Sequence, residues 1–277
     1  MKYTAAEFLD LMDGLDSQLF ELLNGLTDDQ WKMPTVASKW CVKDVAAHLL
    51  DGNLRGLSTS RDGYFGDPPG EIDSYQSLVD YLNKLNMSWT QATKRLSPKV
   101  LISMLQMSGP EYVNHLRQLD PLDPAIFSVG WAGEESSTNH FHIAREYSEK
   151  FLHQQQIRDA IGNDGLLTEK YFHPFLEVFM KALPHTFKNI EAERGSIVTV
   201  IVTGHGGGLW SIIKEDQLWM ELHEEPSQPA AAFIIEPTVA WKLFSKSWRK
   251  EKAQYSVEIK GEERLGNQVY EMVAVMA

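Results

Sequence analysis

The stretch AREYSEKFLHQQQIRDAIG, residues 144–162, decides how the first half of the chain is interpreted. Its composition is typical of a helix, and Glu149 and His153 lie four residues apart, so their side chains share one face, one turn above the other. On a helical wheel the polar side chains here form one stripe, made of His142, Glu146, Glu149, His153 and Gln156. A stripe of this kind is typical of an ordinary solvated helix, and it is also compatible with a metal site.

A third ligand is needed before a metal site becomes the better interpretation. Catalytic zinc commonly has three nitrogen or oxygen ligands and one open position. The best candidate for the third ligand is His48, in the helical and largely apolar stretch WCVKDVAAHLL (40–50). A buried imidazole that faces a buried carboxylate needs a partner, and a divalent cation would supply one. The residues alone leave a second interpretation open, in which His48 is a core histidine and the stripe is solvated.

Composition and charge exclude several classes of protein. The 277 residues carry a formal net charge of −12, so a nucleic acid or an anionic membrane is not expected as the main partner. No apolar run approaches the length that spans a bilayer, and the first residues lack the apolar segment of a signal peptide. With one cysteine, Cys41, no internal disulfide can form, and we expect a cytoplasmic protein.

The pattern of apolar residues divides the chain in two near residue 165. Helical periodicity covers about 4–23, 38–50, 74–96, 98–119 and 142–160, with capping-box patterns at Thr4 and Thr27. After GNDGLL (162–167), one more helix is expected over 168–190. Short β-branched and aromatic segments then predict strands in 195–204, 209–215, 217–224, 230–236 and 255–263, with a helix over 238–247. We therefore expect a helical domain over 1–165 and an α+β domain over 166–277.

Two short motifs carry a resemblance to a known family. WCVKDVAAH (40–48) resembles the second-helix signature of the DinB-like four-helix metalloproteins. Arg145, Glu149, His153 and Arg158 lie in a pattern that is similar to the fourth-helix signature of their thiol-dependent branch, the mycothiol-dependent maleylpyruvate isomerases. The pattern after residue 166 resembles the small sterol-carrier-protein-like α+β domain that follows the bundle in that family. The resemblance therefore covers nearly the whole chain.

The resemblance implies a metal centre and a chemistry. His48, Glu149 and His153 match the family's zinc ligands, so one zinc, or another divalent metal such as nickel, is expected per chain. A bound thiol becomes an anion there at neutral pH. The expected partners are a low-molecular-weight thiol, such as mycothiol or bacillithiol, and a small electrophile. The activity would be that of an isomerase or S-transferase, in a monomer or a homodimer. A thiol-independent zinc hydrolase and a non-catalytic metal-binding module remain alternatives.

Other candidates are less well defined. Maleylpyruvate would need a cationic clamp for its carboxylates; Arg158 is the candidate, although a surface ion pair explains it equally well. His142 and Glu146 either orient the ligands or face solvent, and solvent is expected for His142. GHGGGLW (204–210) predicts a hairpin turn rather than an oxyanion or phosphate loop. Trp131, His205 and Trp210 are candidates for contact with the substrate or the thiol.

Overall fold

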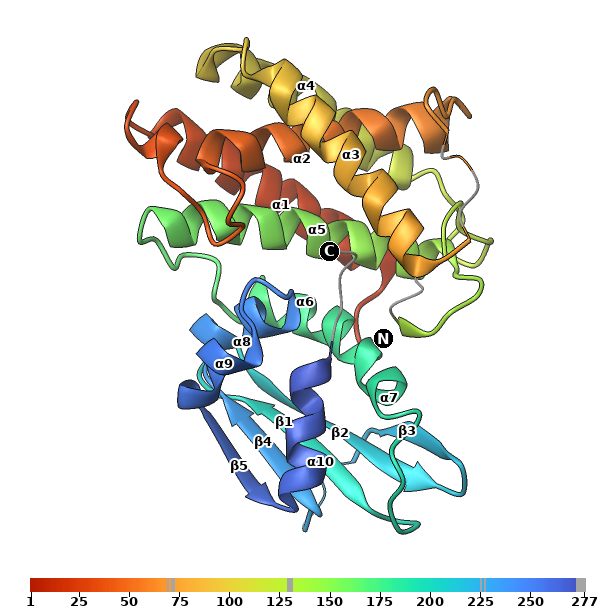
Figure 1. The fold of residues 1–277 in the computed structure, drawn as a ribbon. Coiled ribbons are helices and arrows are strands. Elements are labelled where there is room, and N and C mark those ends of the chain that lie inside the picture. The colour runs from red at the N-terminus through yellow and green to blue at the C-terminus, as the bar shows by residue number, and fades with distance from the viewer. Residues whose placement is uncertain (69, 71–72, 129–131, 225, 227, 273–277) are drawn as a thin grey trace. The chain divides into compact units, whose positions relative to one another are not determined.

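The computed structural model describes residues 1–277 except 69, 71–72, 129–131, 225, 227 and 273–277. The described chain divides into two compact units (Figure 1). Residues 4–126 and 138–164 form a helical unit, whereas residues 1–3, 127–137 and 165–277 form a unit with a five-stranded sheet. The expected sequence of a helical part followed by an α+β part is therefore confirmed.

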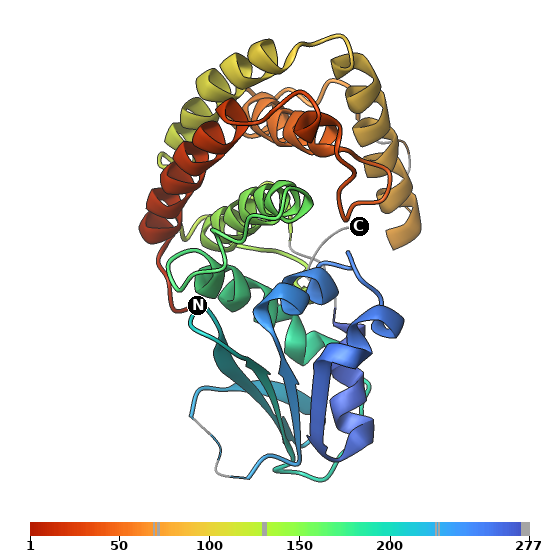
Figure 2. The ribbon, with the colours of Figure 1, turned by 90° about the vertical axis from the view of Figure 1, so that its left-hand side faces the viewer.

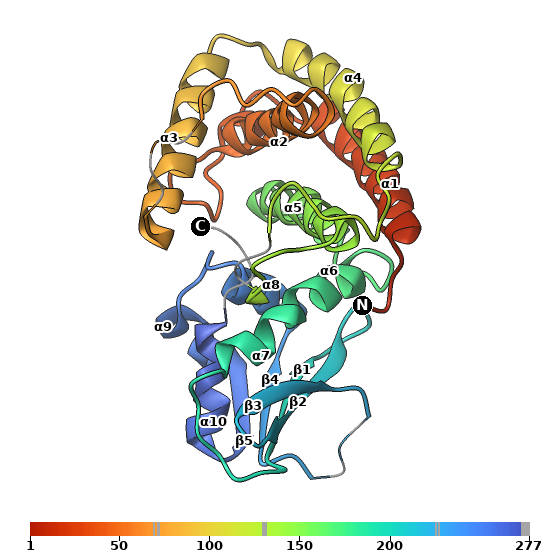
Figure 3. The same cartoon turned by 90° about the vertical axis from the view of Figure 1, so that its right-hand side faces the viewer.

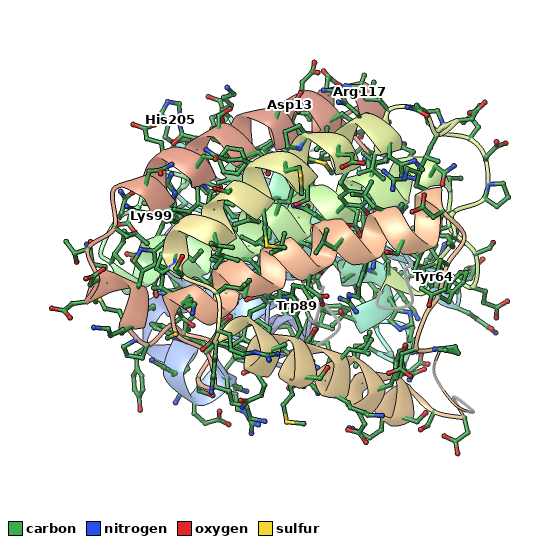
Figure 4. All side chains as sticks on the ribbon, turned by 90° about the horizontal axis from the view of Figure 1, so that it is seen from above. Asp13, Tyr64, Trp89, Lys99, Arg117 and His205 are labelled. Carbon is green, nitrogen blue, oxygen red and sulfur yellow. The ribbon has the colours of Figure 1, made fainter. Side chains whose placement is uncertain are left out.

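The helical unit is built from five long helices. They are α1 (Ala5–Asn24), α2 (Val42–Gly56), α3 (Tyr75–Thr93), α4 (Pro98–Leu116) and α5 (Asn139–Ala160). Both α1 and α2 pack against α4 and α5, whereas α3 packs against α2 on its outer side (Figure 3). Trp89 of α3 lies between α3 and α2 and donates a hydrogen bond from Nε1 to the Ala47 carbonyl oxygen of α2, at 2.7 Å (Figure 4).

The helix starts follow the capping signals of the sequence. Thr4 and Glu7 form the predicted capping box of α1, in which each side chain satisfies a backbone N–H of the other residue. Ser97 caps α4 in front of Pro98, whose missing N–H costs nothing at the first position of a helix. Local sequence therefore determines where these two helices begin.

Helix α5 differs from the expectation of a solvated polar stripe. Because α1 and α2 both pack against it, much of its polar surface is buried. The expectation that His142 faces solvent is wrong, since that residue is only 3% exposed. Lys150 is also buried, and its Nζ donates to Asp16 Oδ1 of α1 at 2.7 Å. The helical unit thus has a polar interior along α5, in which buried polar groups need partners.

The second unit is a mixed sheet with the strand order β3-β2-β1-β4-β5. Its strands are β1 (Ile197–Val202), β2 (Gly208–Glu215), β3 (Leu218–Leu222), β4 (Ala231–Ile235) and β5 (Val257–Gly261). All neighbours pair antiparallel except β1 and β4, which are parallel. The five predicted strands are confirmed, and so is the hairpin turn between β1 and β2, where Gly204 has φ +78°.

Short helices accompany the sheet and gather mainly on one of its faces (Figures 2 and 3). They are α6 (Phe172–Phe179), α7 (Leu183–Thr186), α8 (Pro237–Phe244), α9 (Lys250–Ala253) and α10 (Glu263–Gln268). The single helix predicted over 168–190 is wrong, because a 3₁₀ turn at Met180–Ala182 separates α6 from α7. Pro184 lies in the first turn of α7, where its missing N–H is tolerated, and it cannot continue a preceding helix without loss. In the described part of the chain, no helix is long and apolar enough to span a membrane.

Candidate metal centre

Local hydrogen bonds between residues close in sequence fix the start of α2. Pro34 and Cys41 form an isolated antiparallel bridge, and the Thr35 N–H donates to the Trp40 carbonyl oxygen at 3.1 Å. The Asp44 carboxylate accepts the Cys41 backbone N–H at 3.1 Å and so caps the helix. The aspartate of the WCVKDVAAH motif therefore has a structural task, which is to fix the direction in which α2 begins.

The three predicted ligands meet between α2 and α5. The rings of His48 and His153 are in edge contact, with centroids 4.5 Å apart. His153 Nε2 lies 3.3 Å from Glu149 Oε2, one helical turn away. Trp40 covers this group, with its ring centroid 4.8 Å from that of His48 and 6.3 Å from that of His153. The structure thus brings His48 to a carboxylate and a second histidine that lie about 100 residues further along the sequence.

Hydrogen bonding orients His153 towards Glu149. Its Nδ1 donates to Gln156 Oε1 at 3.0 Å, so the proton of a neutral ring is on Nδ1. The Nε2 lone pair then points at a carboxylate oxygen, an arrangement that is favourable only if a proton or a cation lies between the two atoms. Gln156 was seen in the sequence only as part of the polar stripe, and the structure gives it this orienting role.

His48 also has the properties that a metal ligand needs. Burial lowers the pKa of His48 well below its usual value, and the charges of His153 and Arg55 add to this effect. The ring is therefore neutral at neutral pH, as metal binding requires. Its Nδ1 is buried and has no hydrogen-bond partner among the described residues. This unsatisfied atom and the donor set of two imidazoles and one carboxylate fit a divalent cation such as zinc.

The spacing of the three side chains is not that of a closed metal site. Over the described residues, no group of three or more His, Cys, Asp or Glu side chains has an arrangement that could hold a metal ion as it stands. The direct contact between His153 and Glu149, and that between the two rings, occupy the space in which an ion would lie. Side-chain rotation of Glu149, which is partly exposed, would open that space.

A second polar group lies further along α5. Arg145 Nη2 donates to His142 Nδ1 at 3.1 Å and to Glu146 Oε1 at 2.6 Å. Burial alone would raise the pKa of Glu146, but the charge of Arg145 and further partners, including the Tyr112 hydroxyl, hold it below its usual value. Burial, followed by the negative charge of Glu146, raises the pKa of Tyr112 well above its usual value. Glu146 is therefore ionised and held by α4 as well as by α5.

A third polar pair lies on α2, outside the motifs that the sequence shows. Asp51 Oδ2 and Arg55 Nε are 3.0 Å apart, in a pair in which the Asp51 side chain is buried and the Arg55 side chain as a whole is 39% exposed. Burial raises the pKa of Asp51, an effect that Arg55 opposes. Their positions three and seven residues after His48 are the signal that could have found them, because these spacings place all three side chains on one side of α2.

The remaining candidates lie in other environments. Arg158 is buried rather than on the surface, and its guanidinium donates to Asn163 Oδ1 at 2.9 Å and to Gln18 Oε1 at 3.2 Å. His205 is 90% exposed, 3.6 Å from Glu169. Trp210 donates from Nε1 to Glu177 Oε1 at 2.9 Å and lines an open groove of about 700 Å³ in the sheet unit. Trp131 lies outside the described residues.

Comparison with known proteins shows the family to which the chain belongs. A family model described as the mycothiol maleylpyruvate isomerase N-terminal domain matches residues 13–158, which contain α2, all but the last two residues of α5, and the three candidate ligands. The match covers more than half of the chain, so the chain belongs to the mycothiol maleylpyruvate isomerase family, which is a family of enzymes.

Solved structures show the same fold. The chain is similar to a crystal structure of the mycothiol-dependent maleylpyruvate isomerase, with a TM-score of 0.57 and 10% sequence identity over 94% of this chain and 95% of that one. A crystal structure of a histidine-to-alanine mutant of that isomerase gives a TM-score of 0.56, with the same identity and coverage. A search of curated proteins finds no match.

Proposed function

We propose that this chain is a metal-dependent enzyme that uses a low-molecular-weight thiol, an isomerase or S-transferase of the maleylpyruvate isomerase type. The observation that carries the proposal is the meeting of His48 with the Glu149–His153 pair under Trp40. These three residues would hold the metal, most simply zinc, with nickel as another divalent candidate. The thiol would be mycothiol, in line with the family, or a related thiol such as bacillithiol.

When bound, the metal would favour the anionic form of a thiol at neutral pH, and such a thiolate adds reversibly to a conjugated carbon–carbon double bond. The residues of the chain prepare this chemistry. Gln156 fixes the tautomer of His153, and burial keeps His48 neutral. Trp40 excludes water from one side of the group, which strengthens every electrostatic interaction inside it.

The same proposal extends to the architecture. The packing of α1, α2, α4 and α5 supports a DinB-like four-helix bundle, with α3 as an addition against α2. The mixed sheet and its short helices support a sterol-carrier-protein-like α+β domain, with a boundary near residue 165. We place the enzyme in the cytoplasm, as a monomer or homodimer. Trp210, which lines a groove, and the exposed His205 remain candidates for contact with the small-molecule partners.

The test is thiol dependence of a cobalt-substituted protein. Cobalt replaces zinc in such sites and makes them visible by absorption. The proposal predicts a spectrum that changes with thiol concentration, together with turnover of a conjugated electrophile only when thiol is present. The Glu149→Gln variant should lose both signals. Turnover of simple esters or amides without thiol would favour a hydrolase instead. A cobalt spectrum that does not change when thiol is added would favour a non-catalytic metal-binding module.

A further inference from the structure

The polar side chains of α2 and α5 form a continuous seam that starts at the candidate metal centre. On α2 the seam contains His48, Asp51 and Arg55, and on α5 it contains His153, Glu149 and the Arg145–Glu146–His142 group. The two helices pack against each other, with His48 in contact with His153. This contact joins the middle of α2 to a late turn of α5. At the end of α2, Gly56 approaches Tyr112, which reaches Glu146 of α5, so the seam continues along both helices.

Several buried atoms of this seam make no hydrogen bond among the described residues. They are Asp51 Oδ2, Arg55 Nε, Arg145 Nε and His142 Nε2. Asp51 Oδ2 and Arg55 Nε are close, at 3.0 Å, but they are not aligned for a hydrogen bond. A buried polar atom without a partner costs about 1–3 kcal/mol, and more when it is charged. These atoms therefore leave hydrogen-bonding capacity in the seam that water or a polar ligand can satisfy.

Arg55 differs from the other arginines of the helical unit. The guanidinium of Arg145 is engaged by His142 and Glu146, and that of Arg158 is engaged by Asn163 and Gln18. Arg61 and Arg117 are paired with carboxylates away from the seam. Over the described residues, the ion pair recorded for Arg55 is the one that its Nε makes with Asp51, and its side chain is 39% exposed. It is therefore the seam arginine with a free face for an anion.

The direction of the Arg55 side chain brings this face near the metal centre. Side chains on a helix lean towards its N-terminus, and Arg55 reaches back to Asp51, four residues earlier. Asp51 in turn is only three residues, about 4.5 Å of helix axis, from His48. Arg55 itself is seven residues, about 10.5 Å of helix axis, from His48, and its side chain leans back over this interval towards that ligand.

We infer that Arg55 binds a carboxylate of the electrophile and so selects carboxylate-bearing substrates, with Asp51 positioning the guanidinium. The inference rests on the proposed function, because the electrophile is the partner that the function requires. A carboxylate held by the guanidinium fork leaves the carbons next to it within reach of the group formed by His48, Glu149 and His153. The other two arginines have structural partners: Arg145 donates to Glu146, and Arg158 connects the end of α5 to Gln18 of α1.

The test is the binding of maleate, a small cis-dicarboxylate, to the full chain with and without zinc, measured by calorimetry. Maleate should bind the wild type, and Arg55→Gln should weaken binding about 10- to 100-fold, the range expected for a lost charge-assisted hydrogen bond. Arg55→Lys should recover part of the affinity, because it keeps the charge but not the fork. The exposed Arg95→Gln is the matched control and should bind like the wild type.

Two comparisons keep this test decisive. Maleamide, the uncharged diamide of the same shape, should not distinguish the wild type from Arg55→Gln. Arg55→Gln leaves the buried Asp51 without its cation, and this single variant can fail to fold for that reason. In that case the double variant Asp51→Asn/Arg55→Gln, which removes both charges, is measured in its place. Equal maleate affinity in the wild type and these variants, or no maleate binding by the wild type, would overturn the inference. A chain that binds maleate through Arg55 yet shows no thiol-dependent turnover would contradict the proposed function alone.

Discussion

At His142, burial opposes protonation. Burial is the main cause that lowers the pKa of this residue from 6.5 to about 4, and although Glu146 acts in the other direction, Arg145 adds to the lowering. Arg145 donates to Nδ1, which is possible only while that nitrogen carries no proton. His142 therefore serves as a neutral acceptor that holds Arg145, and through it Glu146, in place.

This environment predicts a loss of stability in acid. Between about pH 6.5 and pH 4 the unfolded chain binds a proton at His142 that the folded chain does not, so the free energy of unfolding falls as the pH falls through this window. The loss would approach about 3 kcal/mol for this group. His142→Gln, whose amide oxygen can still accept from Arg145, should flatten that part of the curve in urea unfolding at a series of pH values. An unchanged acid slope in the variant would contradict the prediction.

The sequence predicted the meeting of Glu149 and His153 because their contact is local. A spacing of four residues on a helix places two side chains together whatever the rest of the fold does. The place of His48 depends on how α2 packs against α5, and it was proposed from an apolar setting and a family resemblance. Arg55 and Tyr112 could not be selected, because their roles arise from the approach of other helices, which one sequence does not specify.

At the scale of elements, α2 and α4 approach closely at Gly56. A Cβ atom at this position would lie 2.4 Å from ring atoms of Tyr112, whereas a Cβ at Gly52 of the same helix would meet nothing within 4 Å. The close approach places the Tyr112 hydroxyl where it reaches Glu146. One glycine of α2 is therefore required by packing, and the other is not.

The two glycines give a matched pair of variants. Gly56→Ala should destabilise the protein by about 1–3 kcal/mol, because the added methyl group pushes the Tyr112 ring out of its place. Gly52→Ala should instead stabilise it by about 0.5–1 kcal/mol, through helix propensity alone. Urea unfolding measures both values. Equal effects in the two variants would show that α2 and α4 do not approach as described.

The order and type of the elements were largely predictable, whereas their burial was not. Capping residues and hydrophobic periodicity locate α1 and α4, and short β-branched runs locate the strands, because these signals are local. The polar composition of α5 pointed to a solvated helix. In the structure α5 is covered by α1 and α2, and Lys150 and Arg158 are buried with partners from α1. Tertiary packing decided this outcome.

At the scale of the whole molecule, an acidic chain contains a local concentration of cationic side chains and candidate metal ligands. The formal net charge is −12, yet Arg55, Arg145 and two histidines line one seam of the helical unit. A divalent cation there would join α2 to α5 and would stabilise the folded state by mass action, since the unfolded chain does not hold the three ligands together. Metal content and stability should therefore change together.

The most direct measurement is the metal content of the wild type and of His153→Ala, both purified without a His-tag and analysed by mass spectrometry. We expect about one divalent ion per chain in the wild type, which is the stoichiometry of a single site with three ligands. The variant should lose it, and the wild type should unfold at a lower temperature after chelation. A wild type that holds no metal even after incubation with zinc would contradict the site formed by His48, Glu149 and His153.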